Sequence, residues 1–275
     1  MNATATAGTL QDALTEAAAA RPVLVPYVTG GITHDWTDCL SAYAAAGADA
    51  IEIGLPFSDP MLEGPVIQAA SQRALDRGAT PRSLLAEIGR HDVGVPLVVM
   101  TYTNVVVRAG LDRFCASLRE AGVGGLAVPD TPWAEVGPLS AAAVAAGIDL
   151  VLLVAPSTPP ARQREIAART RGFLYAVSRL GTTGERAELS TEVAGLTAGL
   201  RPHARTPVLV GFGLSTPEHA VRATRTSDGV VVGSALMHRA LDGATPADLG
   251  AEVSRWRTAL DGAGPHSPPA RRGGR

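Results

Sequence analysis

The sequence of 275 residues contains no lysine, because all 24 of its basic residues are arginine. A chain without lysine cannot form a Schiff base with a carbonyl substrate or with pyridoxal phosphate. It also lacks the lysine with which P-loop proteins contact phosphate. Chemistry that depends on a lysine of this polypeptide is therefore excluded.

Cysteine is also scarce, and Cys39 and Cys115 are the only two in the sequence. We expect each in a helix beside apolar neighbours, as a buried free thiol, which excludes a disulfide framework and a cysteine-based metal site. The six histidines are scattered, with no pair four residues apart on a helix, so the sequence predicts no metal site.

Strong charge and long apolar runs are absent as well. The net charge of −2 indicates no nucleic-acid partner. No apolar run approaches the length needed to cross a membrane, and the N-terminus has no basic patch followed by an apolar core. We therefore expect a cytoplasmic protein, and its hydrophobic content of 46% is sufficient for a large core.

The chain alternates short β-branched runs with longer helical patterns. Near-continuous apolar strands separated by helices are typical of a parallel sheet covered by helices. Eight such units at this length favour a closed (β/α)8 TIM barrel over an open sheet, and no G-x-G-x-x-G follows the first strand. The predicted strands are Val23–Thr29, Ala50–Leu55, Pro96–Tyr102, Gly125–Pro129, Leu150–Ala155, Phe173–Ser178, Val208–Gly211 and Gly229–Val232. The predicted helices include Trp36–Ala46, Pro65–Arg77, Arg82–Ile88, Asp112–Glu120, Ala134–Ala146, Pro160–Thr170 and Pro217–Thr224.

The two ends of the chain have different predicted roles. Leu10–Ala20 reads as a helix before the first strand that closes the barrel floor. Residues 262–275 have no periodicity and are predicted to be a disordered tail. The sequence thus predicts one barrel domain over residues 1–261.

Two acids stand out at the end of the second predicted strand. Glu52 interrupts an apolar strand, and an unpaired buried carboxylate is costly. Glu63 follows in a Pro/Gly/Ser/Asp loop just before a helix start. Each acid has a plain structural reading: Glu52 could be a carboxylate held by a backbone or arginine partner, and Glu63 a helix-start acid favoured by the dipole. Two carboxylates at one strand end are also the arrangement that acid–base catalysis needs.

Glycines gather at the ends of the last strands, where barrels commonly bind phosphate. Gly211-Phe212-Gly213 ends the seventh strand, Gly233-Ser234 ends the eighth before a short helix, and residues 178–184 after the sixth contain further glycines. Glycine lets backbone N–H groups approach an anion, and a helix N-terminus supplies a favourable field. The pattern predicts a phosphorylated small-molecule substrate.

These motifs occur together in an unusual combination. They are Ala46-Gly47-Ala48-Asp49, Glu52-Ile53-Gly54-Leu55-Pro56-Phe57-Ser58-Asp59-Pro60, Gly64-Pro65, Ile67-Gln68, Tyr102-Thr103-Asn104, Ser178-Arg179, Gly181, Thr183-Gly184, Gly211-Phe212-Gly213 and Gly233-Ser234. Over about residues 23–240 the chain closely resembles the tryptophan synthase alpha subunit family. The resemblance implies reversible retro-aldol cleavage of indole 3-glycerol phosphate to indole and glyceraldehyde 3-phosphate. It also implies that the chain itself needs no cofactor or metal, and that a beta subunit carrying pyridoxal phosphate is its partner in an αββα assembly.

The resemblance assigns roles to particular residues. Glu52 matches the proton-transfer glutamate, Glu63 the second catalytic carboxylate beside the indole nitrogen, and Thr183 the threonine of the closing loop. The predicted phosphate-binding residues are Gly184, Gly213, Gly233 and Ser234. The predicted substrate pocket comprises Ile67, Tyr102, Tyr175, Phe212 and Ala127. The loop residues Pro56, Asp59 and Pro60 match the contact with the beta subunit.

The chain departs from the family pattern at several positions. The family normally has Asp where Glu63 stands, and a carboxylate misplaced by about 1 Å can cost on the order of a hundredfold in rate. Gly31-Ile32-Thr33 replaces Gly-Asp-Pro after the first strand, Ala127 stands where larger aliphatic residues are usual, and Pro129 and Trp133 are uncommon.

These departures leave three alternatives. One is a stand-alone indole 3-glycerol phosphate lyase that supplies indole to a secondary pathway. Another is a catalytically weak protein that activates a beta subunit. The third is a different phosphate-binding barrel, such as an isomerase or synthase of histidine or tryptophan biosynthesis. Indole-glycerol phosphate synthase chemistry uses lysine, so its absence argues against that enzyme.

Overall fold

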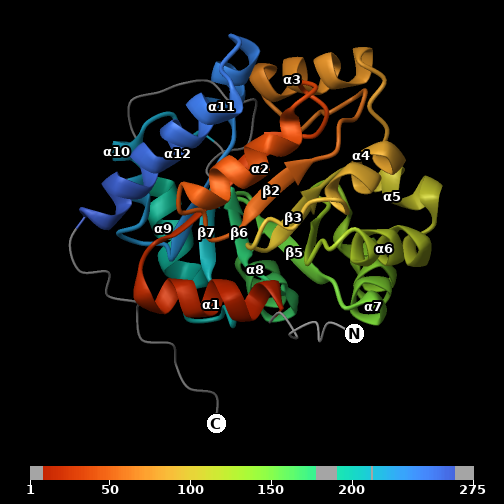
Figure 1. The fold of residues 1–275 in the computed structure, drawn as a ribbon. Helices are drawn as coiled ribbons and strands as arrows, with labels where there is room; N and C mark the ends of the chain where they lie inside the picture. The colour runs from red at the N-terminus through yellow and green to blue at the C-terminus, as the bar shows by residue number, and fades with distance from the viewer. Residues whose placement is uncertain (1–8, 178–190, 212, 264–275) are drawn as a thin grey trace, which may run out of the picture.

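Eight parallel strands close into a barrel in which each strand pairs with the next and the last pairs with the first. The computed structural model describes residues 9–177, 191–211 and 213–263. The predicted (β/α)8 barrel is confirmed (Figure 1). Its strands are β1 Val23–Thr29, β2 Ile51–Gly54, β3 Leu97–Met100, β4 Gly125–Ala127, β5 Asp149–Val154, β6 Leu174–Val177, β7 Val208–Gly211 and β8 Gly229–Val232.

Helices follow the strands and surround the barrel (Figure 1). Three of them begin with a threonine cap followed by proline, at Thr80, Thr216 and Thr245, and this pairing favours a helix start. The helices are α1 Leu10–Ala20, α2 Trp36–Ala45, α3 Pro65–Asp76, α4 Pro81–Ile88, α5 Thr103–Ala109, α6 Leu111–Glu120, the 3-10 turn η1 Trp133–Glu135, α7 Val136–Ala146, α8 Pro160–Arg169, α9 Thr191–Leu200, α10 Pro217–Ala223, α11 Ser234–Leu241 and α12 Pro246–Asp261.

Helix α1 closes the end of the barrel where the strands begin, as the sequence predicted (Figure 1). Its buried side chains Leu10, Leu14 and Ala18 join the apolar cluster that fills the barrel interior. The backbone N–H of Gln11 donates to the Asp149 carboxylate on β5 at 2.9 Å. Both contacts fix the helix across the floor.

Acids at this floor are held by arginines and backbone amides. The Asp49 carboxylate lies 2.8 Å from Arg21 and 3.3 Å from the buried Arg257, and it accepts the N–H of Leu24 at 2.8 Å. These contacts satisfy a carboxylate that is otherwise expensive to bury. The ion pairs at this end of the barrel therefore stabilise the fold. Chemistry in barrels occurs at the opposite end, where the strands finish.

The structure describes little beyond α12. Helix α12 ends at Asp261, next to the start of the predicted tail, and residues 264–275 of that tail lie outside the described residues. Within the described part of the chain no helix is long and apolar enough to cross a membrane.

Candidate active site

Glu52 points into the barrel near the end where the strands finish. Its neighbours Ile51 and Ile53 belong to the outer cluster between strands and helices, whereas Ala50 belongs to the interior cluster. Alternation along a strand therefore directs Glu52 inward. Its side chain is 1% exposed, and its Oε1 atom has no hydrogen-bond partner among the described residues. No arginine forms an ion pair with Glu52 among the described residues, so the reading of Glu52 as a carboxylate held by an arginine loses support.

The loop between β2 and α3 brings Glu63 to the same place. The Glu63 N–H donates to the carbonyl of Pro60 at 2.9 Å, and the Gln68 side chain donates to the Glu63 carbonyl at 2.9 Å. These bonds form a turn just before Gly64, the residue that precedes α3. Glu63 is only 7% exposed, so it does not face water at the helix start.

One small cavity contains both acids. Its wall is formed by Tyr27, Glu52, Glu63, Ile67, Met100, Tyr175, Gly213, Leu214, Val231, Gly233 and Ser234. The cavity volume is about 30 Å³, far below the ~300 Å³ of a typical ligand pocket. A substrate the size of indole 3-glycerol phosphate is therefore larger than the cavity that these residues enclose.

Burial changes the acidity of the two carboxyls. Burial, and next the neighbouring Glu63 carboxylate, raise the pKa of Glu52 to about 8. Burial raises the pKa of Glu63 to about 7. Two interacting acids titrate as a pair, so near neutral pH the two buried carboxyls do not both ionise as free glutamates do. The site thus contains an acid and a carboxylate side by side without any cofactor.

Glycines create the room that the aromatic walls need. A Cβ atom on Gly54 would lie 1.9 Å from the Tyr27 hydroxyl, and one on Gly211 would lie 2.4 Å from the Tyr175 ring. The Thr29 hydroxyl donates to the Tyr27 hydroxyl at 3.2 Å. The glycines of β2 and β7 therefore let two tyrosines occupy the barrel mouth.

The predicted phosphate-binding residues follow the ends of β7 and β8. Gly213, Gly233 and Ser234 line the cavity, and Gly213 has a positive φ of 83° that suits glycine. Ser234 is the first residue of α11, so the positive end of that helix faces the cavity. Gly184 and Thr183 lie outside the described residues.

The predicted substrate walls are brought together only in part. Ile67 and Tyr175 line the cavity. Tyr102 is buried nearby but stacks on Phe57, with ring centroids 5.1 Å apart, and does not line it. Phe212 lies outside the described residues.

Two departures from the family pattern lie away from the cavity as it stands. Ala127 is fully buried in the interior cluster and does not line the cavity. Trp133 packs on α8, where the guanidinium groups of Arg162 and Arg169 lie 4.8 and 4.9 Å from its ring centroid. Neither residue contacts the two acids directly in this arrangement.

Four lining residues escaped the sequence analysis: Tyr27, Met100, Leu214 and Val231. Side chains alternate between the two faces of a strand, and in β1, β3 and β8 this alternation assigns Tyr27, Met100 and Val231 to the barrel interior. The sequence does not reveal which face is interior, because both faces of these strands are apolar.

The predicted partner loop is at the surface beside the acids. Asp59 is exposed, Pro60 is half-buried and Pro56 is buried. The adjacent Met61 and Leu62 are 74% and 44% exposed, which is unusual for large apolar side chains. No group of three His, Cys, Asp or Glu side chains within the described ranges could hold a metal ion.

Comparison with known proteins gives a consistent result. The family model described as "Tryptophan synthase alpha chain" matches residues 14–253. The tryptophan synthase alpha chain of Synechococcus sp. (strain CC9902) is 43% identical over 253 residues, covering 88% of this chain and 93% of the relative. That of Chloroflexus aurantiacus is 43% identical over 227 residues, covering 81% and 85%.

Solved structures with this fold give the same answer. The Mycobacterium tuberculosis tryptophan synthase structure in space group F222 matches with a TM-score of 0.83 and 33% identity, covering 92% of this chain and 98% of that chain. Tryptophan synthase subunit alpha from Legionella pneumophila matches with a TM-score of 0.81 and 31% identity, covering 93% and 99%.

Proposed function

The chain belongs to the tryptophan synthase alpha chain family, and from that premise we propose that Glu52 and Glu63 form the acid–base pair of its reaction. The enzyme is a carbon–carbon lyase of tryptophan biosynthesis that cleaves indole 3-glycerol phosphate reversibly to indole and glyceraldehyde 3-phosphate. The reaction needs no cofactor on this chain, and pyridoxal phosphate belongs to the beta subunit. The burial of both acids in one cavity, with raised pKa values, is the observation that supports the proposal most.

Cleavage requires one proton to arrive and one to leave. Protonation at C3 of the indole converts the ring to a cation, which accepts the electron pair of the C3–glycerol bond as that bond breaks. Removal of the proton from the adjacent glycerol hydroxyl then leaves the aldehyde. In this mechanism Glu52 donates the first proton and, as the resulting carboxylate, accepts the second, so the enzyme ends in its starting protonation state.

Glu63 acts as the carboxylate in this scheme. The scheme assigns the proton of the pair to Glu52, which is consistent with the order of the two raised pKa values, about 8 for Glu52 and about 7 for Glu63. A buried carboxylate beside the ring N–H stabilises the positive charge that develops on the indole. Its burial increases this effect, because water does not screen it.

Gly213, Gly233 and Ser234 bind the phosphate in this proposal. No arginine lines the described cavity, so backbone N–H groups, the Ser234 hydroxyl and the N-terminus of α11 supply the attraction. Thr183 and Gly184 complete the closing loop by resemblance. Anchoring the phosphate at this wall holds the glycerol carbons between it and Glu52.

The experiment compares indole release by the wild-type protein, Glu52→Gln and Glu63→Gln. The wild type should release indole and glyceraldehyde 3-phosphate in equal amounts, and both variants should lose at least about a hundredfold in kcat while still binding inorganic phosphate. Full activity of Glu52→Gln would refute the assignment. Folding is checked in each variant by its unfolding transition in urea.

We also propose a beta subunit as partner and the cytoplasm as location. The exposed loop of Asp59, Pro60, Met61 and Leu62 beside the active site supports a contact there. Indole release that rises strongly with a beta subunit would support this partner. Rapid release that a beta subunit does not change would instead identify a stand-alone lyase. Beta activation that survives Glu52→Gln would reveal an activating role separate from catalysis.

A further inference from the structure

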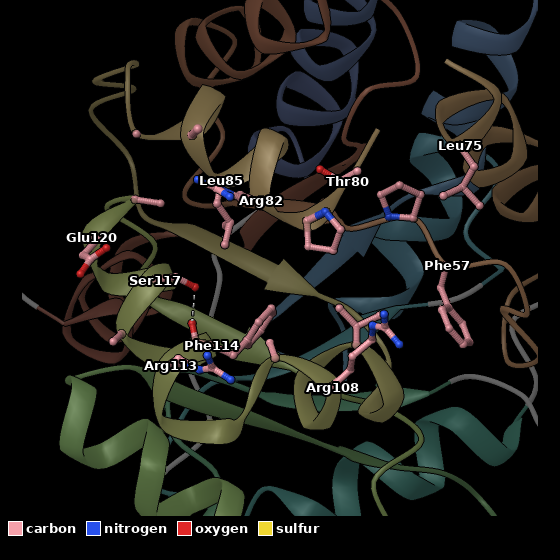
Figure 2. A pocket seen from close by; sticks show the side chains of 18 of the residues that line it. Phe57, Leu75, Thr80, Arg82, Leu85, Arg108, Arg113, Phe114, Ser117 and Glu120 are labelled. Carbon is pink, nitrogen blue, oxygen red and sulfur yellow. Dashed lines mark hydrogen bonds between the residues drawn. The ribbon is translucent and has the colours of Figure 1, made fainter. Parts of the chain in front are cut away.

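A second and much larger cavity lies on the outer surface of the barrel (Figure 2). It has a volume of about 1260 Å³ and separates α4 from α5 and α6. We name it the α4–α6 groove. One end lies at Pro56 and Phe57, in the loop that follows β2, and the other lies at Arg90 and Glu120, near the barrel floor.

The groove is a gap in the helical layer. Several other pairs of helices pack together: α2 contacts α12, α3 contacts α11 and α6 contacts α7. Between α4 and α6 the floor of the groove is instead formed by apolar side chains, among them the buried Leu85 and Phe114 and the half-buried Val105 and Ala109. A long apolar strip between two helices is the surface that a third helix usually covers.

The rim of the groove is basic. Arg82, Arg90, Arg108 and Arg113 line it, while Glu120 is its one acid, and three of these arginines surround the groove in Figure 2. Among the described residues none of the four arginines forms an ion pair. Other arginines of the chain, such as Arg21 and Arg201, are paired with carboxylates. Four arginines without an ion pair among the described residues therefore lie beside the apolar floor, against one acid, Glu120.

We propose that the α4–α6 groove docks an acidic amphipathic helix of the partner protein, with its apolar face on the floor and carboxylates toward the arginines. A helix of about ten residues is roughly 10 Å wide and 15 Å long, which gives a volume of about 1200 Å³, close to that of the groove. Naming the partner as the beta subunit rests on the proposed function. The groove shares Pro56 with the proposed partner loop, so one partner can contact both.

The charge of the groove is tested by titrating a beta subunit into two triple variants. Arg82→Gln, Arg90→Gln and Arg113→Gln together remove charge from the groove. Arg119→Gln, Arg164→Gln and Arg225→Gln together remove the same charge from exposed arginines outside it that have no ion pair among the described residues. The groove triple should weaken binding about tenfold or more at about 0.05 M salt, with a smaller effect at about 0.3 M, while the control triple should change binding little.

The apolar floor is tested by filling it. Ala86 lines the groove and is exposed on α4, so Ala86→Trp should weaken beta binding at both salt concentrations. Ala141 is exposed on α7 outside the groove, and Ala141→Trp should leave binding unchanged. All variants should retain the indole release of the isolated chain, which shows that the barrel is intact.

The possible results distinguish the groove proposal from the lyase assignment and from the proposal of a beta-subunit partner. Equal binding by the two triples, or by the two tryptophan variants, would overturn the groove and leave the lyase assignment standing. Failure of the wild type to bind any beta subunit would overturn both the partner and the groove. Loss of binding in the groove variants alone would confirm the proposal.

Discussion

Replacing Glu52 with glutamine should make the protein more stable at neutral and alkaline pH. The unfolded chain ionises this glutamate near pH 4.5, whereas the folded chain holds its proton up to about pH 8. Between these two values the folded state binds more protons than the unfolded state. The free energy of unfolding therefore falls as the pH rises from about 4.5 to about 8 and is constant above that.

The magnitude follows from the size of the pKa difference. Each pKa unit corresponds to 1.36 kcal/mol, so a rise from 4.5 to about 8 costs the folded state on the order of 5 kcal/mol at pH 8.5. Glutamine has nearly the same shape and does not titrate. Glu52→Gln should thus match the wild type near pH 4 and exceed its stability by a few kcal/mol at about pH 8.5.

Urea unfolding of both proteins across this pH range measures the difference. Glu16→Gln, at an exposed position on α1, serves as the control and should follow the wild-type pH dependence. A Glu52→Gln variant whose stability tracked the wild type at every pH would refute the idea of a buried, uncompensated acid. The same variant should be inactive, so stability and activity should change in opposite directions.

Three further predictions test the site and its support. Glu63→Asp withdraws the carboxylate by about 1 Å and should lower kcat for indole release about a hundredfold, and an activity equal to the wild type would contradict it. Gly54→Ala places a Cβ 1.9 Å from the Tyr27 hydroxyl and should cost about 1–3 kcal/mol in urea unfolding; no loss would show that the tyrosine moves freely. Asp49→Asn leaves Arg257 buried without one of its carboxylate partners and should cost about 3–5 kcal/mol in urea unfolding, so a loss below about 1 kcal/mol would contradict the structural role given to the floor.

Most of the fold could be predicted because each strand is an apolar run bounded by turn residues. The bounds of β1, β7 and β8 agree with the sequence analysis at both ends. Helix α5 was not foreseen, because its Val105-Val106-Val107 run has low helix propensity. The Asp130 carboxylate, from the loop after β4, accepts the Thr103 N–H at 2.8 Å and supports the start of this helix. A contact between distant loops has no signature in local sequence.

Site residues could be predicted where a polar or charged side chain interrupts an apolar strand. Glu52 stood out because an acid is rare in an apolar strand, and the structure places it inward with Glu63 in one cavity. Tyr27 did not stand out, because a tyrosine among apolar residues reads as core. The small volume of the cavity and the gap between α4 and α6 depend on how helices pack, which periodicity alone does not give.

The pH dependence of kcat/KM for indole release tests the shared proton of Glu52 and Glu63 most directly. The account predicts a bell-shaped profile with its maximum between about pH 7 and 8, because activity needs Glu63 ionised and Glu52 protonated. A profile that is flat from about pH 6 to pH 9 would contradict it.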